Sequence, residues 1–417
     1  MALTLLTNIK LLAGVRKEIP LLRRMELGIL PCIENAYLVI EDDRISEYGR
    51  MEEINNQKST IKNQIDVAGQ SIIPAWCDSH THLVFATSRE DEFVDKLKGK
   101  TYAEIAAKGG GILNSARKLN TTSEDELFRL AWGRLEEVSR SGTGAIEIKS
   151  GYGLSVEGEL KMLRVIKKLK ERSGLLIKSS FLGAHTYPAE YKDDHKGYID
   201  LIINEMLPVI ARENLADYID VFCETGFFSM EETETICRAG MKHGLKPKIH
   251  ANQLSLSGGV QTGVKLGALS VDHLETMDDD SINTLAGSAT IGTLLPTAAF
   301  FLRMPFQPAR KLVDAGCAIA LASDYNPGSS PSGNMNLVIA MSCIGMRMLP
   351  EEAINAATIN GAHAMELQNE AGSITVGKKA NLILTRSIPS LAYIPYAFGS
   401  NLIDRVMING EWIMASS

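Results

Sequence analysis

Strand-like and helix-like sequence alternates regularly through the middle of this chain of 417 residues. Eight short segments rich in small and β-branched residues recur there, separated by polar sequence that includes amphipathic stretches such as 156–172 and 230–243. The eight segments are residues 71–82, 144–153, 177–186, 218–226, 247–253, 268–275, 289–297 and 318–328. This alternation predicts an α/β fold, a closed parallel (β/α)8 barrel of the TIM type. An open doubly wound sheet is the alternative, but no glycine-rich nucleotide motif follows the first segment.

The two ends of the chain look different from the middle and resemble each other. Residues 36–49 have two apolar runs around an Asp-Asp pair, which is a hairpin pattern. Near the other end, residues 372–385 and 405–415 read as strands, the second with Asn-Gly at its turn. Neither end alone offers enough strands to bury a face. We therefore expect a composite β-sandwich domain from residues 1–70 and 374–417, and a barrel domain from residues 71–373.

Charge and composition exclude several classes of protein. The net charge of −7 disfavours a basic nucleic-acid-binding face, so we expect no nucleic-acid partner. No run approaches the roughly 18 apolar residues of a membrane span, and no basic stretch precedes the first apolar residues as in a signal peptide. The six cysteines are scattered singly, unlike a disulfide framework. These features predict a cytoplasmic protein with no membrane partner.

Side chains that bind metals or move protons follow many of the eight segments. Residues i and i+2 of a strand point to the same side, so His80 and His82 can reach one ion. His250 closes the fifth segment and Asp324 the eighth, at the rim where barrels build active sites. Three imidazoles and one carboxylate suit zinc or ferrous iron. A His-x-His pair alone would more often be a polar strand end, and Lys149 in the second segment is expected to be structural or a hydrogen-bond donor.

Other side chains at the same rim could handle protons and a substrate. A bound ion lowers the pKa of water to about 7, and such water needs a proton acceptor. His273, at the end of the sixth segment, or Asp324 could take that proton, although an orienting hydrogen bond is the competing role for His273. His185 and Gln253 could hold or polarise a substrate carbonyl, but Gln253 cannot be a base because an amide does not titrate near pH 7.

A further set suits a small anion. Arg89 offers a planar fork for a carboxylate, Tyr152 offers a hydroxyl, and the stretch 326–331 offers backbone N–H groups with the Ser329 hydroxyl. Taken singly, a surface salt bridge, a half-buried aromatic and an ordinary turn are equally good readings of these features.

Five blocks of the sequence carry a family resemblance. They are SHTHLVFATSREDEF (79–93), EIKSGYGL (147–154), FLGAHTYPAEY (181–191), DVFCETGFFS (220–229) and SDYNPGSSP (323–331). The chain resembles the amidohydrolase superfamily and, within it, the imidazolonepropionases of histidine degradation, almost from end to end. That resemblance implies a barrel with a small β domain and one zinc or iron ion per chain. It also implies a homodimer that hydrolyses 4-imidazolone-5-propanoate, a small-molecule substrate, to N-formimidoyl-L-glutamate.

The resemblance also implies residue roles. Metal ligands would be His80, His82, His250 and Asp324, and substrate contacts would be Arg89, Tyr152, His185, Gln253, Asn326, Gly328 and Ser329. Catalytic roles would fall to His273, Asp324 and His185. Some relatives have glutamate where this chain has Gln253, so its proposed proton-carrying role shifts here toward His273 and Asp324. A nucleobase deaminase and a catalytically inactive scaffold are the rival classes; the carboxylate-binding set argues against the first, and the complete ligand set argues against the second.

Overall fold

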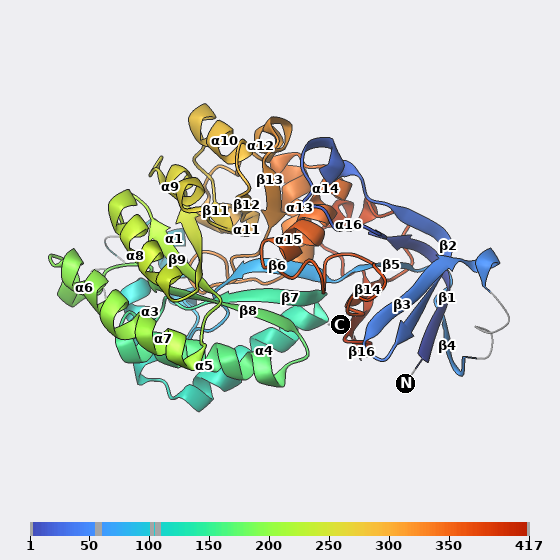
Figure 1. Ribbon diagram of the computed structural model, residues 1–417, viewed down its shortest axis with the longest axis horizontal. Helices are drawn as coiled ribbons and strands as arrows, with labels where there is room; N and C mark the ends of the chain where they lie inside the picture. The colour runs from blue at the N-terminus through green and yellow to red at the C-terminus, as the bar shows by residue number, and fades with distance from the viewer. Residues whose placement is uncertain (1–2, 55–60, 101–103, 105–109, 415–417) are drawn as a thin grey trace.

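A computed structural model describes residues 3–54, 61–100, 104 and 110–414 of the chain. Two eight-stranded sheets organise these residues, and helices surround one of them, while the other lies at one end of the molecule (Figure 1). The helix-wrapped sheet is parallel, and the second sheet mixes strands from both ends of the chain. The predicted α/β barrel and the predicted meeting of the two termini in one sheet are both confirmed.

The parallel sheet runs in strict chain order from its first strand to its last. Its strands are β6 Trp76–Thr81, β7 Thr143–Lys149, β8 Leu176–Ala184, β9 Tyr218–Cys223, β10 Lys246–Ala251, β11 Ser270–His273, β12 Ile291–Leu294 and β13 Ala318–Leu321. All but three residues of these strands, Leu176, Lys178 and Lys246, are buried, as expected when helices cover the outside and side chains fill the inside. Each of the eight predicted segments contains most or all of one of these strands.

The two edges of this sheet meet through residues that follow its last strand. The backbone N–H of Asp324 donates to the carbonyl of His80 over 3.0 Å, and the N–H of His82 donates to the carbonyl of Tyr325 over 2.9 Å. The seam of the barrel therefore joins two stretches that both carry candidate metal ligands.

Helices connect the strands and cover the barrel. They are α1 Glu90–Leu97, α3 Ile112–Thr121, α4 Glu124–Arg140, α5 Val156–Arg172, α6 His195–Leu201, α7 Leu207–Glu213, α8 Met230–Lys242, α9 Gly259–Leu266, α10 Asp279–Ala286, α11 Pro296–Leu302, α12 Ala309–Ala315, α13 Met335–Met346, α14 Pro350–Ala357, α15 Ile359–His363 and α16 Tyr393–Tyr396. Shorter turns are η1 Arg24–Gly28, η2 Met51–Glu53, η4 Ala189–Tyr191 and the π-helical η5 Ile202–Met206.

Local sequence explains where the two helices expected from the sequence begin and end. The Ser155 hydroxyl caps α5 by accepting from the N–H of Gly158, and Ser229 and Glu232 form a reciprocal capping box on α8. Helix α5 has the predicted bounds. Helix α8 ends one residue before the predicted His243, because Gly244 takes a left-handed conformation (φ 83°) that terminates the helix.

The mixed sheet joins the beginning and the end of the chain. Its strands are β1 Leu3–Ala13, β2 Cys32–Glu41, β3 Arg44–Arg50, β4 Asn63–Asp66, β5 Ser71–Pro74, β14 Leu382–Thr385, β15 Ile403–Ile408 and β16 Glu411–Met414. The predicted hairpins turn at Asp42–Asp43 and at Asn409–Gly410. Asp42, Asn409 and Gly410 have positive φ there, as is common in tight hairpin turns. Residue 415 lies outside the described residues.

Only the last part of the predicted strand region 372–385 is a strand. Before β14 the chain makes single bridges, Val15 with Ile374 and Arg44 with Lys379. The buried ammonium group of Lys378 donates to the Ala371 carbonyl and the Ser373 hydroxyl, so this stretch folds around a lysine instead of pairing as a strand.

The first predicted barrel segment, 71–82, is divided between the two sheets. Ser71–Pro74 pairs with β1 on one side and with β14 on the other, and only β6 enters the barrel. Ala75 makes the crossing, with its N–H bound to the carbonyl of Asn381. Both parts are apolar because both are buried, so composition could not separate them.

Among the described residues, none of the helices is long and apolar enough to cross a membrane.

The buried amide of Asn360 ties three elements together, and we expect its loss to destabilise the fold. Its Nδ2 donates to the carbonyls of Leu22 and Ile319 over 2.9 Å each, and its Oδ1 accepts from the Leu22 N–H. Asn360→Leu leaves these backbone groups buried and unpaired, and should lower the free energy of unfolding by about 2–4 kcal/mol. Chemical denaturation measures this loss. The control Asn283→Leu, exposed on α10, should stay within about 0.5 kcal/mol of the parent; equal effects would contradict the assignment.

Candidate metal centre and active site

Four predicted metal ligands converge at the carboxyl end of the barrel strands. His80 lies in β6, His82 directly after it, His250 in β10, and Asp324 shortly after β13. The Nε2 atoms of His82 and His250 are 3.4 Å apart, and Asp324 Oδ1 lies 3.5 Å from His80 Nε2 and 3.6 Å from His82 Nε2. All four side chains are buried.

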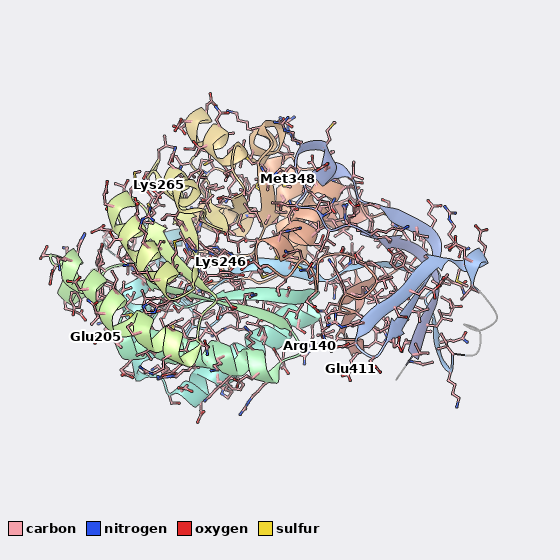
Figure 2. The ribbon with its side chains drawn as sticks, in the orientation of Figure 1. Arg140, Glu205, Lys246, Lys265, Met348 and Glu411 are labelled. Carbon is pink, nitrogen blue, oxygen red and sulfur yellow. The ribbon has the colours of Figure 1, made fainter. Side chains whose placement is uncertain are left out.

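Within the described residues, neither group of side chains that could hold a metal lies at the opposite end of the barrel. Lys246, labelled in Figure 2, begins β10, is exposed, and pairs with Glu366, whereas His250 four residues further along the same strand is buried. One strand thus runs from a surface ion pair to the candidate site.

The four side chains fit a metal ion. Ligands at about 2.0–2.1 Å from a tetrahedral ion lie about 3.4 Å from one another, which is close to the separations seen here. The Nε2 atom of His80 is buried and has no hydrogen-bond partner among the described residues, which is costly unless it binds something. His80, His82 and His250 form one compact group, and His80, His273 and Asp324 form an overlapping one.

The Nδ1 atom of each of the three histidines, opposite the Nε2 atom that faces the candidate metal position, lies near an oxygen atom of the chain. Asp272 Oδ2 accepts from His80 Nδ1 over 2.7 Å, and Asp220 Oδ1 accepts from His250 Nδ1 over 3.0 Å. His82 Nδ1 lies 3.4 Å from the Ser150 carbonyl. A proton held on Nδ1 leaves the lone pair on Nε2, where a metal would bind.

Sequence reasoning missed both aspartates. Each stands inside an apolar strand, in YIDVF (218–222) and SVDH (270–273), and that unusual placement of a charge was the signal available. Register places Asp272 beside His250 across β10 and β11, and it places Asp220 beside Lys248, two residues before His250, across β9 and β10.

A buried charge network lies next to these histidines. Lys149 Nζ is 2.7 Å from Asp220 Oδ2, 3.5 Å from Asp272 Oδ2 and 2.5 Å from Glu147 Oε1. Lys248 also pairs with Glu147. Three carboxylates against two ammonium groups leave one negative charge, and Asp324 adds a second. A divalent cation would neutralise that buried charge.

Electrostatics separates the histidines into two kinds. Burial, reinforced by neighbouring charges, holds the pKa of His80, His82 and His250 well below the ordinary value, so these rings stay neutral, as metal ligands must. Burial is also the largest single influence on His273 and opposes its charge, but the carboxylates of Glu275, Asp324 and Asp272 together outweigh burial and raise the pKa of His273. His273 Nδ1 lies 3.5 Å from Glu275 Oε1. His273 is thus the ring suited to carry a proton.

The backbone at this rim is strained. His273 has φ 87°, Asn252 φ 54° and Asp324 φ 53°, all in the left-handed region that side chains other than glycine rarely adopt. Strained conformations concentrate where function fixes side-chain direction. Here they occur where β10, β11 and β13 give way to their loops.

Asp324 is embedded in a loop that other predicted residues build. Burial raises the pKa of the Asp324 carboxyl to about 6, against hydrogen bonds and the charge of His273 that favour its ionised form. The Ser329 hydroxyl donates to Asp324 Oδ2 over 3.2 Å. The Asn326 side chain donates to the Asp324 carbonyl and accepts from the N–H groups of Gly328 and Ser329. In this structure Asn326 and Ser329 shape the loop around the ligand.

The predicted anion-binding residues lie beside the metal ligands. Tyr152 contacts the rings of His82 and His185 edge-on, with centroids 5.8 and 5.5 Å away, and His185 stacks on His82 at 5.4 Å. Burial lowers the pKa of His185 to about 4, and Arg89 is close enough for its charge to act on both Tyr152 and His185.

Arg89 already has a carboxylate partner within the chain. Its Nε and one terminal nitrogen donate to Glu92 Oε2 over 2.9 and 2.6 Å. The other terminal nitrogen packs so closely on Gly328 that a Cβ there would come within 2.4 Å of it. A larger residue at position 328 would therefore displace the guanidinium, which lies between Glu92 and the loop that holds Asp324.

Gln253 and Glu224 occupy neighbouring strand ends. Gln253 is nearly buried, three residues beyond His250. Glu224, directly after β9, accepts from the N–H groups of Thr225 and Leu254 over 2.9 Å each. Glu224 thus braces the loops after β9 and β10, including the loop with Gln253.

Comparison with known proteins agrees with this geometry. The model of the amidohydrolase family matches residues 71–413. An imidazolonepropionase of Flavobacterium johnsoniae is 58% identical over 99% of this chain and 100% of its own length, and one of Christiangramia forsetii is 55% identical over 98% and 99%. Among solved structures, guanine deaminase of E. coli has a TM-score of 0.74 at 14% identity, covering 100% of this chain and 99% of its own.

A second solved structure, a mutant atrazine chlorohydrolase of Arthrobacter aurescens complexed with zinc, has a TM-score of 0.73 at 13% identity, covering 99% of this chain and 95% of its own. At such identities these two structures show the shared fold alone. The chain belongs to the amidohydrolase family. Within that family its sequence places it among the imidazolonepropionases.

Removing one imidazole should empty the metal site without unfolding the barrel. We expect His80→Ala to lower the zinc or iron content of the purified protein by at least about tenfold, because the ion loses a ligand that Asp272 orients. Metal analysis and circular dichroism test this together. His195→Ala is the control, since His195 is exposed and paired with Glu232, and it should keep its metal. Near-stoichiometric metal in His80→Ala would place the ion elsewhere.

Proposed function

We propose that this chain hydrolyses the ring amide of 4-imidazolone-5-propanoate to N-formimidoyl-L-glutamate, as an imidazolonepropionase. Two things support the activity: 58% identity to an imidazolonepropionase along almost the whole chain, and a buried group of three histidines that fits a metal ion. The observation that carries it is the convergence of His80, His82 and His250, with the buried His80 Nε2 left unpaired beside Asp324.

One zinc or iron ion per chain is the proposed cofactor. His80, His82, His250 and Asp324 would hold it, and nitrogen and oxygen donors in this number suit either metal. When bound, such an ion lowers the pKa of water and polarises a carbonyl oxygen.

The chain's own side chains would then handle the protons. His273, whose pKa the charge of Glu275 raises, is proposed to accept a proton and to deliver one to the ring nitrogen that leaves. Asp324 is the second candidate, and it is the weaker base because a bound cation would lower the basicity of its carboxylate. His185 stays neutral and is proposed to orient the substrate carbonyl, with Gln253 as a neutral hydrogen-bonding partner.

The propanoate group would bind on the Arg89 side of the site. Arg89, Tyr152 and the loop of Asn326, Gly328 and Ser329 lie together there, and a guanidinium with a hydroxyl favours an aliphatic carboxylate over an uncharged nucleobase. Glu92 occupies part of the fork, so we propose that substrate shares or displaces this contact.

We also propose a homodimer located in the cytoplasm, with a composite terminal domain of 1–70 and 374–417 and a barrel of 71–373. The pairing of β5 with β1 and β14 favours placing the first boundary between the two domains at Ala75 instead of at residue 71.

The direct test of the activity is the loss of ultraviolet absorbance of imidazolone propanoate, with and without a chelator. Chelator-insensitive loss or no loss would overturn the proposal.

His273 and Gln253 should respond differently to substitution. We expect His273→Asn to lower kcat by about 10²–10⁴, the usual contribution of a positioned acid or base, with the metal retained. Gln253→Ala should chiefly raise KM, and Gln253→Glu should keep substantial activity because some relatives carry glutamate there. Steady-state kinetics at matched metal content measures all three. An unchanged kcat in His273→Asn would transfer the proton step to Asp324.

Arg89 should be needed for substrate recognition. Arg89→Lys replaces a planar fork with a point charge, so we expect a lower kcat/KM even though the positive charge remains. Arg89→Ala should cost about 2–5 kcal/mol of transition-state binding. Arg129→Ala is the control, because Arg129 forms a comparable pair with Glu126 but is exposed on α4. Wild-type constants for Arg89→Ala would remove Arg89 from the site.

A further inference from the structure

The roles proposed so far leave unused a fully buried cation, the side chain of Lys149. It points from β7 into the barrel interior, where its ammonium group lies 2.7 Å from Asp220 Oδ2 and 3.5 Å from Asp272 Oδ2. A third contact, 2.5 Å to Glu147 Oε1, comes from its own strand. A lysine with no exposed surface needs such partners. Two of them, Asp220 and Asp272, also bind histidines of the candidate metal site.

Both aspartates have a second duty. Asp220 uses its other oxygen, Oδ1, to hold His250 Nδ1, and Asp272 uses Oδ2 to hold His80 Nδ1. The Ser270 hydroxyl fixes the remaining oxygen of Asp272 over 2.5 Å. Every carboxylate oxygen of the pair therefore has one assigned donor or more, and within the described part of the chain only Lys149 forms an ion pair with both aspartates.

We propose that Lys149 is a positioning residue for the metal centre, one ammonium group that sets the orientation of two metal-binding imidazoles on different strands through Asp220 and Asp272. The chain of contacts runs from Lys149 to Asp220 to His250, and from Lys149 to Asp272 to His80. Without the cation, Asp220 keeps only its hydrogen bond with His250 among the described residues, and Asp272 keeps only those with His80 and Ser270. Each aspartate is then a less firmly held buried anion, and it orients its imidazole less firmly.

The neighbouring Lys248 is a matched control. It is equally buried and also pairs with Glu147, so it belongs to the same network and carries the same charge. Its other contacts are the carbonyls of Ser79 and Ala364, at 3.3 and 3.2 Å, and the face of the Tyr218 ring, 5.3 Å from the ammonium nitrogen. Its charge acts on Asp272 only from a distance. Removing Lys248 therefore disturbs the charge balance of the core without freeing either aspartate from a direct partner.

The test measures Zn²⁺ affinity by competition with a chromophoric chelator, which does not depend on any substrate or on the proposed hydrolysis. We expect Lys149→Met to weaken Zn²⁺ binding by about 10–100-fold, the usual effect of losing support for metal-binding side chains. Lys248→Met should change Zn²⁺ affinity by less than about threefold while lowering the unfolding midpoint of the metal-free protein to a comparable extent. Equal affinities of the two variants would overturn the proposal.

A second comparison covers the case in which Lys149→Met does not fold. Lys149→Met combined with Asp220→Asn removes a positive and a negative charge together, so the net charge of the core is unchanged. If Lys149 acts on His250 through Asp220, this double variant should bind Zn²⁺ at most about tenfold more weakly than Asp220→Asn alone. Any additional loss of affinity within that range would come from the effect of Lys149 on Asp272. A further loss of 100-fold or more would show that Lys149 acts by another route and would overturn the proposal.

Discussion

A buried ammonium group must keep its counter-charges in contact, and this requirement governs the centre of the barrel. Barrels of this type commonly fill their interior with branched aliphatic side chains. Here Lys149, Lys248, Glu147, Asp220 and Asp272 occupy it, all with no exposed surface. Because these charges come from β7, β9, β10 and β11, the strands cannot shift relative to one another without breaking an ion pair in a medium of low polarity. Because Asp272 and Asp220 also bind His80 and His250, the same ion pairs fix the positions of these two histidines.

The same surroundings shift the pKa values of neighbouring histidines in opposite directions. His80, His82 and His250 face burial and one another, which keeps them neutral, whereas His273 faces the Glu275 carboxylate, which favours its charged form. Glu275 is itself held by Gln307 over 2.9 Å, so the group that tunes His273 is fixed by the loop before α12. The proposed division between metal ligands and proton carrier therefore depends on the neighbours of each ring.

Strand-end histidines were predictable because a barrel brings the carboxyl ends of all its strands to one rim, whatever their separation in sequence. The alternation of segments was equally readable, and helix α5 follows its capping pattern to the residue. The supporting aspartates were not predictable, since their partners are set by register between strands and not by spacing along one strand. For the same reason the sequence did not predict that 71–82 is divided between two sheets, since both of its stretches are apolar. Nor did it predict the pairing of Arg89 with Glu92, which depends on how α1 begins.

The position of β5 has a consequence for biosynthesis. This strand lies between β1, made at the start of translation, and β14, which contains residues 382–385 near the end. One edge of β5 must therefore stay unpaired until the ribosome has made nearly the whole chain. β6, with His80, follows β5 after a single residue, so the strand that begins the metal site is anchored on both sides only when synthesis is almost complete. The terminal sheet is thus completed late in synthesis. In a nascent chain that lacks β14, the strand leading to the first candidate metal ligands would have one unpaired edge.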